Sequence, residues 1–102
     1  METVRQAVKK YGDPNDLDTF QVIHGWTSAK LFAMGLEKAG KNLTRKGFMD
    51  GMATIQNYAN DGLSAPVTFG PNNTYGIRGQ KIYGFDFKQN RVVPLTEWIA
   101  PK

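Results

Sequence analysis

This chain of 102 residues, with 40% hydrophobic and 22% charged side chains, has the composition of one small globular domain rather than of a disordered or membrane-spanning protein. It has no cysteine, which excludes a disulfide scaffold, a thiolate metal site and a cysteine nucleophile. The net charge of +4 is spread along the chain in pairs of basic residues among acidic ones, which favours a solvated surface over a nucleic-acid footprint.

The first segment has the pattern of a short helix followed by a turn. Val4, Ala7 and Val8 recur at helical spacing between residues 2 and 10, and Gly12 follows as a stop signal. Residues 13–16 then predict a turn, because Pro14 disfavours a helical conformation in the residue before it.

A long helix is predicted from residue 20 to Gly40, with Asp18 or Thr19 as its N-cap and Gly40 as its C-terminal glycine. Its apolar side chains cover more than one face, so we expect it to be buried over much of its circumference. The main apolar stripe consists of Val22, Trp26, Ala29, Ala33 and Leu36.

A second helix is predicted to begin after Thr44, which can cap its N-terminus. Its apolar face would consist of Phe48, Met52, Ile55 and Ala59. Gly47 and Gly51 lie inside this helix, where glycine is unfavourable, and we interpret both as sites of close packing against a neighbouring element.

The remainder of the chain predicts a connection followed by a β-hairpin. Residues 62–80 are rich in glycine, proline and asparagine around a short strand at 67–69, which indicates a flexible connection. Residues 81–88 then alternate, with Tyr83, Phe85 and Phe87 on one face, before a turn and a second strand at 92–95. The aromatic face is either a core-facing ladder or a stacking platform for bases; the lack of clustered basic residues beside it favours the ladder.

No catalytic or metal-binding constellation is recognisable. His24 is the single histidine, and a packed or helix-capping role is favoured because no nucleophile or ligand cluster accompanies it. Asp16 and Asp18 are interpreted as turn and cap residues. The glycine-rich stretch lacks the ending of a phosphate-binding loop. We therefore expect a protein that is not an enzyme and uses no cofactor or metal.

Five short motifs occur in an order that resembles a known family: Ile23-His24-Gly25-Trp26-Thr27-Ser28-Ala29, Gly35-Leu36-Glu37-Lys38-Ala39-Gly40, Leu43-Thr44-Arg45, Pro66-Val67-Thr68-Phe69 and Val93-Pro94-Leu95-Thr96-Glu97-Trp98. Together they resemble the C-terminal part of a type I periplasmic binding protein. The most similar subgroup is the branched-chain amino acid class of ABC transporter substrate-binding proteins. The resemblance covers nearly all of this chain.

The resemblance implies an α/β fold, specifically a C-terminal fragment of a two-lobe periplasmic binding protein-like I fold with two long helices, a crossover segment and a terminal β-hairpin. Residues 1–12 would end a second-lobe helix and residues 13–19 would form a crossover. Residues 20–62 would be first-lobe helices, residues 63–80 a strand and crossover, and residues 81–102 the second-lobe hairpin and tail.

The implied function is extracytoplasmic binding of an amino acid or small organic acid for an ABC uptake transporter. The expected ligand-binding residues are Phe20, Gln21, Ile23 and His24. The expected partners are the small-molecule ligand and the membrane permease of the transporter, with no nucleic acid. A periplasmic location is expected, with a signal peptide that is not part of this sequence.

On its own, such a piece would expose large apolar faces, so we expect it to self-associate as a homo-oligomer. The alternative is a small free-standing α+β interaction module, with nucleic acid as its candidate partner. A nucleic-acid affinity that falls steeply with salt would favour that alternative.

Overall fold

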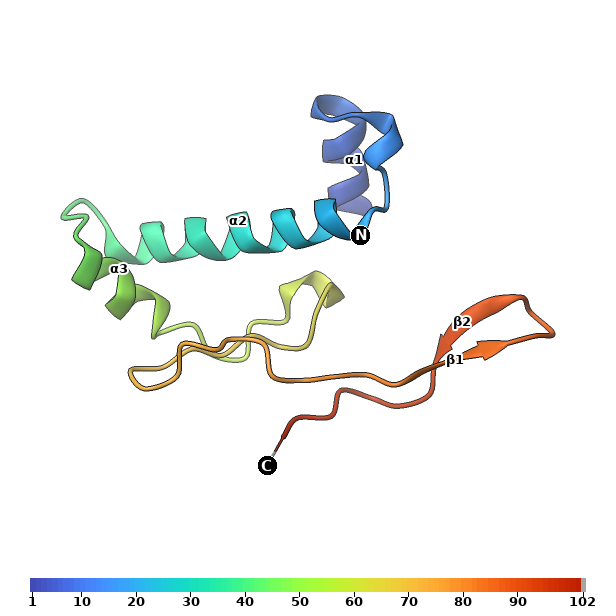
Figure 1. Ribbon diagram of the computed structural model, residues 1–102. Helices are drawn as coiled ribbons and strands as arrows, with labels where there is room; N and C mark the ends of the chain where they lie inside the picture. Colours follow the sequence, from blue (N-terminus) through green and yellow to red (C-terminus); the bar gives the residue numbers. More distant parts are fainter. Residues whose placement is uncertain (102) are drawn as a thin grey trace.

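The computed structural model describes residues 1–101, and Lys102, the last residue of the predicted tail, lies outside the described residues. Within that range the chain combines helices with one antiparallel hairpin, which agrees with the predicted mixture of helix and strand. Figure 1 shows the helices gathered on one side and the hairpin projecting from the other. The elements are α1 (Glu2–Tyr11), a 3-10 turn (Pro14–Asp16), α2 (Phe20–Ala39), α3 (Arg45–Met52), a second 3-10 turn (Asn60–Gly62), β1 (Tyr83–Asp86) and β2 (Arg91–Pro94).

Helix α1 is fixed to the start of α2 by one ion pair. The Nε atom of Arg5 lies 2.7 Å from Oδ1 of Asp18, the residue in left-handed conformation two positions before α2. Val4 and Val8 are the buried side chains of α1. The predicted turn is confirmed, and the carboxylate of Asp13 caps it by accepting a hydrogen bond from the backbone of Asn15.

Helix α2 has the predicted ends but a different buried face. Thr19, one of the two predicted caps, accepts a hydrogen bond from a backbone N–H of the first turn, and Gly40 ends the helix at φ 71°. Thr27, Leu31 and Gly35, which step by four residues, are its buried positions. The predicted stripe is therefore wrong as the buried face of this chain: Val22, Trp26 and Leu36 are half-buried, and Ala29 and Ala33 are exposed.

Glycines explain why α2 and α3 pack closely at Gly35, the last buried position of α2. A Cβ atom on Gly35 would lie 2.6 Å from the sulfur of Met52, and one on Gly51 would lie 2.9 Å from Cβ of Lys38. The two helices therefore approach most closely where neither has a side chain, as predicted for Gly51. The same interpretation of Gly47 is wrong, because a Cβ there would meet the cap of its own helix, Thr44 Oγ1, at 3.1 Å.

Helix α3 is shorter than predicted, since it ends at Met52 and does not extend to Ala59. The hydroxyl of Thr54 donates to the carbonyl three residues earlier, at 2.7 Å, and Asn57 adopts a left-handed conformation. Such local side-chain bonds compete with helix propagation. Ile55 is still buried, but it lies in the loop that follows the helix.

Val67 is the most deeply buried apolar residue of the loop region that follows α3. It is completely buried and forms isolated bridges with Tyr58 on one side and Ile77 on the other. Its backbone exchanges two hydrogen bonds with Tyr58, of 2.9 and 2.8 Å. The strand predicted at 67–69 is thus a pair of bridges, too short to form a sheet.

The glycine-rich segment contains internal hydrogen bonds, and its predicted flexibility stays a prediction. Gly70 and Asn73 exchange backbone hydrogen bonds of 3.0 and 3.1 Å, and Thr68 bonds to Gly76 at 3.0 Å. The side chain of Asn73 adds a bond to the carbonyl of Thr68. These contacts join the two sides of the loop that faces α3.

Strands β1 and β2 form the predicted hairpin, with Phe85 opposite Val92. The carboxylate of Asp86 accepts hydrogen bonds from the backbone N–H groups of Lys88 and Gln89, at 2.8 and 3.1 Å. Asn90 then reverses the chain at φ 50°. The turn prediction is confirmed, while the second strand lies one residue earlier than predicted.

The aromatic face of the hairpin is exposed, so the prediction of a core-facing ladder is wrong within residues 1–101. Tyr83, Phe85 and Phe87 are 54%, 47% and 87% exposed. Two segments of the chain, residues 80–82 and 95–99, form a stalk that holds the hairpin away from the helices. In this stalk Gln80 and Ile99 exchange backbone hydrogen bonds of 2.8 and 2.7 Å. Figure 1 shows this stalk as the paired segments that lead to the hairpin.

The molecule is flat and open. Its dimensions are 55 × 40 × 15 Å and its radius of gyration is 16.4 Å, whereas a compact chain of this length has a radius of about 13 Å. Its accessible surface is 7888 Å², whereas a compact monomer of this size exposes about 5,800 Å². The excess of about 2,100 Å² includes many large apolar side chains. Fifteen of these are exposed, among them Phe20, Phe32, Met49, Phe85 and Phe87.

Candidate functional site

The four residues predicted to bind ligand lie in the first turns of α2. Phe20 is 75% exposed, and its ring stacks on that of His24 with centroids 5.7 Å apart and planes inclined by 28°. Gln21 is exposed and Ile23 is half-buried. The structure therefore joins Phe20 and His24 in one aromatic contact at an open surface.

These residues can supply both apolar contact and hydrogen bonds. The imidazole of His24 and the amide of Gln21 offer donors and acceptors beside the ring of Phe20. Because three of the four side chains are exposed, a small molecule held here would need further groups to enclose it. This surface offers the apolar contacts and hydrogen bonds that one side of a ligand-binding cleft would provide.

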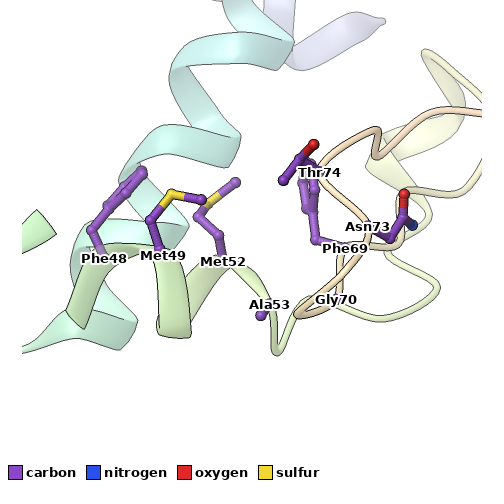
Figure 2. A pocket seen from close by; sticks show the side chains of 8 residues that line it. All are labelled: Phe48, Met49, Met52, Ala53, Phe69, Gly70, Asn73 and Thr74. Atoms are coloured by element: carbon purple, nitrogen blue, oxygen red, sulfur yellow. The ribbon is translucent and has the colours of Figure 1, made fainter. Parts of the chain in front are cut away.

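A separate apolar hollow of about 180 Å³ lies between α3 and the loop at residues 69–74. Figure 2 shows Phe48, Met49 and Met52 on the helix side, with Phe69 on the facing loop. The other lining residues are Ala53, Gly70, Asn73 and Thr74. This hollow was not predicted from the sequence, although Phe48 and Met52 belong to the apolar face predicted for this helix.

The hollow offers few polar groups to a ligand. None of its eight lining residues is charged. The amide of Asn73 is already used: its nitrogen donates to the carbonyl of Thr68 at 3.0 Å, and its oxygen accepts from the backbone of Tyr75 at 3.2 Å. An amino acid brings two charges that need partners when they are buried. The hollow therefore suits an apolar side chain better than a zwitterion.

One charged cluster, formed by Lys30, Asp61 and Tyr58, was considered as a candidate catalytic site. The ammonium of Lys30 lies 2.5 Å from a carboxylate oxygen of Asp61 and 5.8 Å from the centroid of the Tyr58 ring. The hydrogen bond that Lys30 donates to Asp61 is the largest cause that raises the pKa of Lys30 above its ordinary value, and the interaction with the Tyr58 hydroxyl acts in the same direction. This amine stays protonated and paired at neutral pH, so it cannot act as a base or a nucleophile there.

Two further features of residues 1–101 bear on function. In this part of the chain no three His, Cys, Asp or Glu side chains come together as a metal site would require. The helices of the same residues do not include one of the length and apolarity that crossing a membrane demands.

The position of the predicted ligand-binding residues could be read from the sequence, whereas the hollow could not. The position at which α2 begins follows from Thr19 as its cap, which the sequence identifies. The hollow depends on Phe69 facing α3 through a loop closed by Gly70 and Asn73, and alternation within a short strand does not predict that contact.

Comparisons with protein-family models, with curated protein sequences and with solved structures gave no match for this chain.

Proposed function

We propose that this chain supplies elements of both lobes of an extracytoplasmic solute-binding protein that serves an ABC uptake transporter. In this proposal residues 20–62 belong to one lobe, and residues 1–12 and 81–102 belong to the other. Residues 13–19 and 63–80 cross between the lobes. The ordered motifs of the sequence, which resemble the branched-chain amino acid class, are the starting point of the proposal.

The observation that carries this proposal is the separation of the helices from the hairpin. Each part presents an apolar surface that the other part does not cover, and the hydrogen-bonded stalk lies between them. Two-lobed binding proteins are built from two bodies joined by crossing segments that bend as the lobes close on a ligand. The open shape of the chain agrees with membership of two such bodies.

The proposed ligand is an amino acid or a small organic acid. Phe20 and Ile23 give it apolar contact, and Gln21 and His24 give it hydrogen bonds, while residues outside the described chain complete the cleft. The protein holds this ligand without making or breaking a covalent bond and delivers it to the membrane permease.

The test uses the native protein recovered from its source cells with an antibody raised against this chain. We expect the protein in the extracytoplasmic fraction, where it binds an amino acid or a small carboxylic acid in equilibrium dialysis. In that protein Phe20→Ala and His24→Ala each weaken binding about tenfold, equivalent to about 1.4 kcal/mol. Tyr11→Ala, an equally exposed aromatic position, leaves binding unchanged. A cytosolic protein that binds none of these compounds would refute the proposal.

The exposed hairpin favours one other candidate, a free-standing α+β module that binds nucleic acid. Tyr83, Phe85 and Phe87 lie open to solvent, and Lys88 and Arg91 lie near them at the exposed turn. Aromatic residues on a strand can stack on unpaired bases. Single-stranded DNA or RNA affinity that falls steeply between low and high salt would support this candidate; our proposal expects no such binding.

A further inference from the structure

A second hollow, the tail hollow, lies between the glycine-rich segment and the tail that follows the hairpin. Its volume is about 450 Å³, within the roughly 300–1,000 Å³ of small-molecule sites. Its lining comes from residue 57, from positions within 65–79 and from positions within 98–101. None of these residues belongs to α2 or to the hairpin, and only Asn73 also lines the hollow beside α3.

Backbone contacts fix the walls of the tail hollow. Gln80 and Ile99 exchange hydrogen bonds of 2.8 and 2.7 Å, which join the segment before the hairpin to the tail after it. A Cβ atom on Gly79 would lie 2.6 Å from Cβ of Ala65 and 3.9 Å from Cβ of Trp98. The segments therefore pack closely at Gly79, and these walls are in place without a ligand, as in most small-molecule sites.

The tail hollow is electropositive. Its lining includes Arg78 and no acidic residue, and none of the ion pairs within residues 1–101 includes Arg78. Lys81 adds a positive charge beside the hollow, because its ammonium lies 5.0 Å from the centroid of the Trp98 ring. Lys81 pairs with Glu97 at 3.7 Å, but the Glu97 side chain is 96% exposed, so water screens much of this pair.

The tail hollow combines this charge with an apolar wall and a free amide. The ring of Trp98 is 36% exposed and offers a flat surface to a ligand. The side-chain oxygen of Asn57 accepts from the hydroxyl of Thr68 at 3.4 Å, which leaves the amide nitrogen of Asn57 as a donor. The other apolar lining residues are Ala65, Pro66, Ala100 and Pro101.

We propose that the tail hollow binds a small carboxylic acid with a flat apolar body, in its anionic form. The carboxylate accepts two parallel hydrogen bonds from the planar guanidinium of Arg78, and the flat body lies against the ring of Trp98. A zwitterionic amino acid fits less well, because the lining has no acidic partner for its ammonium group. The inference goes beyond the solute-binding role and does not depend on it, because this site shares no residue with the start of α2.

The test is an NMR titration of the full chain with benzoate, followed by the indole N–H resonance of Trp98. Trp26, which lies on α2, supplies the reference resonance. We expect benzoate to shift the Trp98 resonance and to leave that of Trp26 in place. Benzamide has the ring without the charge, and acetate has the charge without the ring, so each should bind at least tenfold more weakly. This comparison uses the unmodified chain and needs no variant to fold.

Two arginine variants then separate the proposed site from the net charge of the chain. Arg78→Gln removes the guanidinium of the tail hollow, and Arg91→Gln removes another exposed guanidinium, on the hairpin. We expect Arg78→Gln to weaken benzoate binding at least tenfold and Arg91→Gln to leave it unchanged. The inference is overturned if benzoate does not shift the Trp98 resonance, if acetate binds as tightly as benzoate, or if the two variants bind benzoate equally.

Discussion

Asp18 shows how a single residue positions the start of α2. Its left-handed backbone turns the chain between α1 and α2, and its carboxylate accepts the hydrogen bond from Arg5 at 2.7 Å. That hydrogen bond lowers the pKa of Asp18, and the attraction of Arg5 and Lys9 acts in the same direction. The group that fixes this corner is thus ionised over the whole neutral range.

The lowered pKa gives the corner a defined dependence on pH. Because the pKa of Asp18 is lower in the folded chain than in the unfolded chain, its stabilising effect is fully present above the unfolded pKa. The effect is lost as the pH falls through the folded pKa. We expect the Nε–H resonance of Arg5 to shift during acidification over this range, and Asp18→Asn to abolish the change. A resonance that does not respond to acid would contradict the assignment.

The contact of α2 with α3 depends on small residues, and two glycines of α2 allow a matched test. A Cβ on Gly35 would clash with Phe48 and Met52, whereas one on Gly25 would have nothing within 4 Å. We expect Gly35→Ala to lower the free energy of unfolding by about 1–3 kcal/mol. Gly25→Ala should raise it by up to about 1 kcal/mol. Chemical denaturation measures both, and equal effects would show that the helices do not meet at Gly35.

Sequence patterns predicted where the helices begin and end better than they predicted which residues pack against one another. Thr19, Thr44 and Gly40 mark helix ends because capping depends on residues close in sequence. The buried face of α2 was not predictable from hydrophobic periodicity alone, because Gly35 allows a neighbour to approach where apolar side chains are absent. The extra turns predicted for α3 failed because local hydrogen bonds, such as that of Thr54, ended the helix.

In the candidate site, too, local features were predictable from the sequence and long-range contacts were not. The start of α2 follows from its cap, and the stacking of Phe20 on His24 follows from their spacing of four residues. The hollow depends on contacts between α3 and a loop about twenty residues later in the chain, at Phe69. Such long-range contacts leave no periodic signal in either segment.

At the scale of the whole molecule, our proposal assigns the exposed apolar surfaces to a larger assembly. Helix α2 packs closely on α3 at Gly35, and the hairpin is held out by hydrogen-bonded segments. Neither arrangement reduces the exposed surface to that of a compact globule. The solute-binding proposal is built on this open shape.

The most direct test is small-angle X-ray scattering from this chain, extrapolated to zero concentration so that the scattering reports on single molecules. We expect a radius of gyration near the 16.4 Å of the open chain. A radius of about 13 Å, the value for a compact chain of this length, would show that the helices and the hairpin share one interior and would contradict the account.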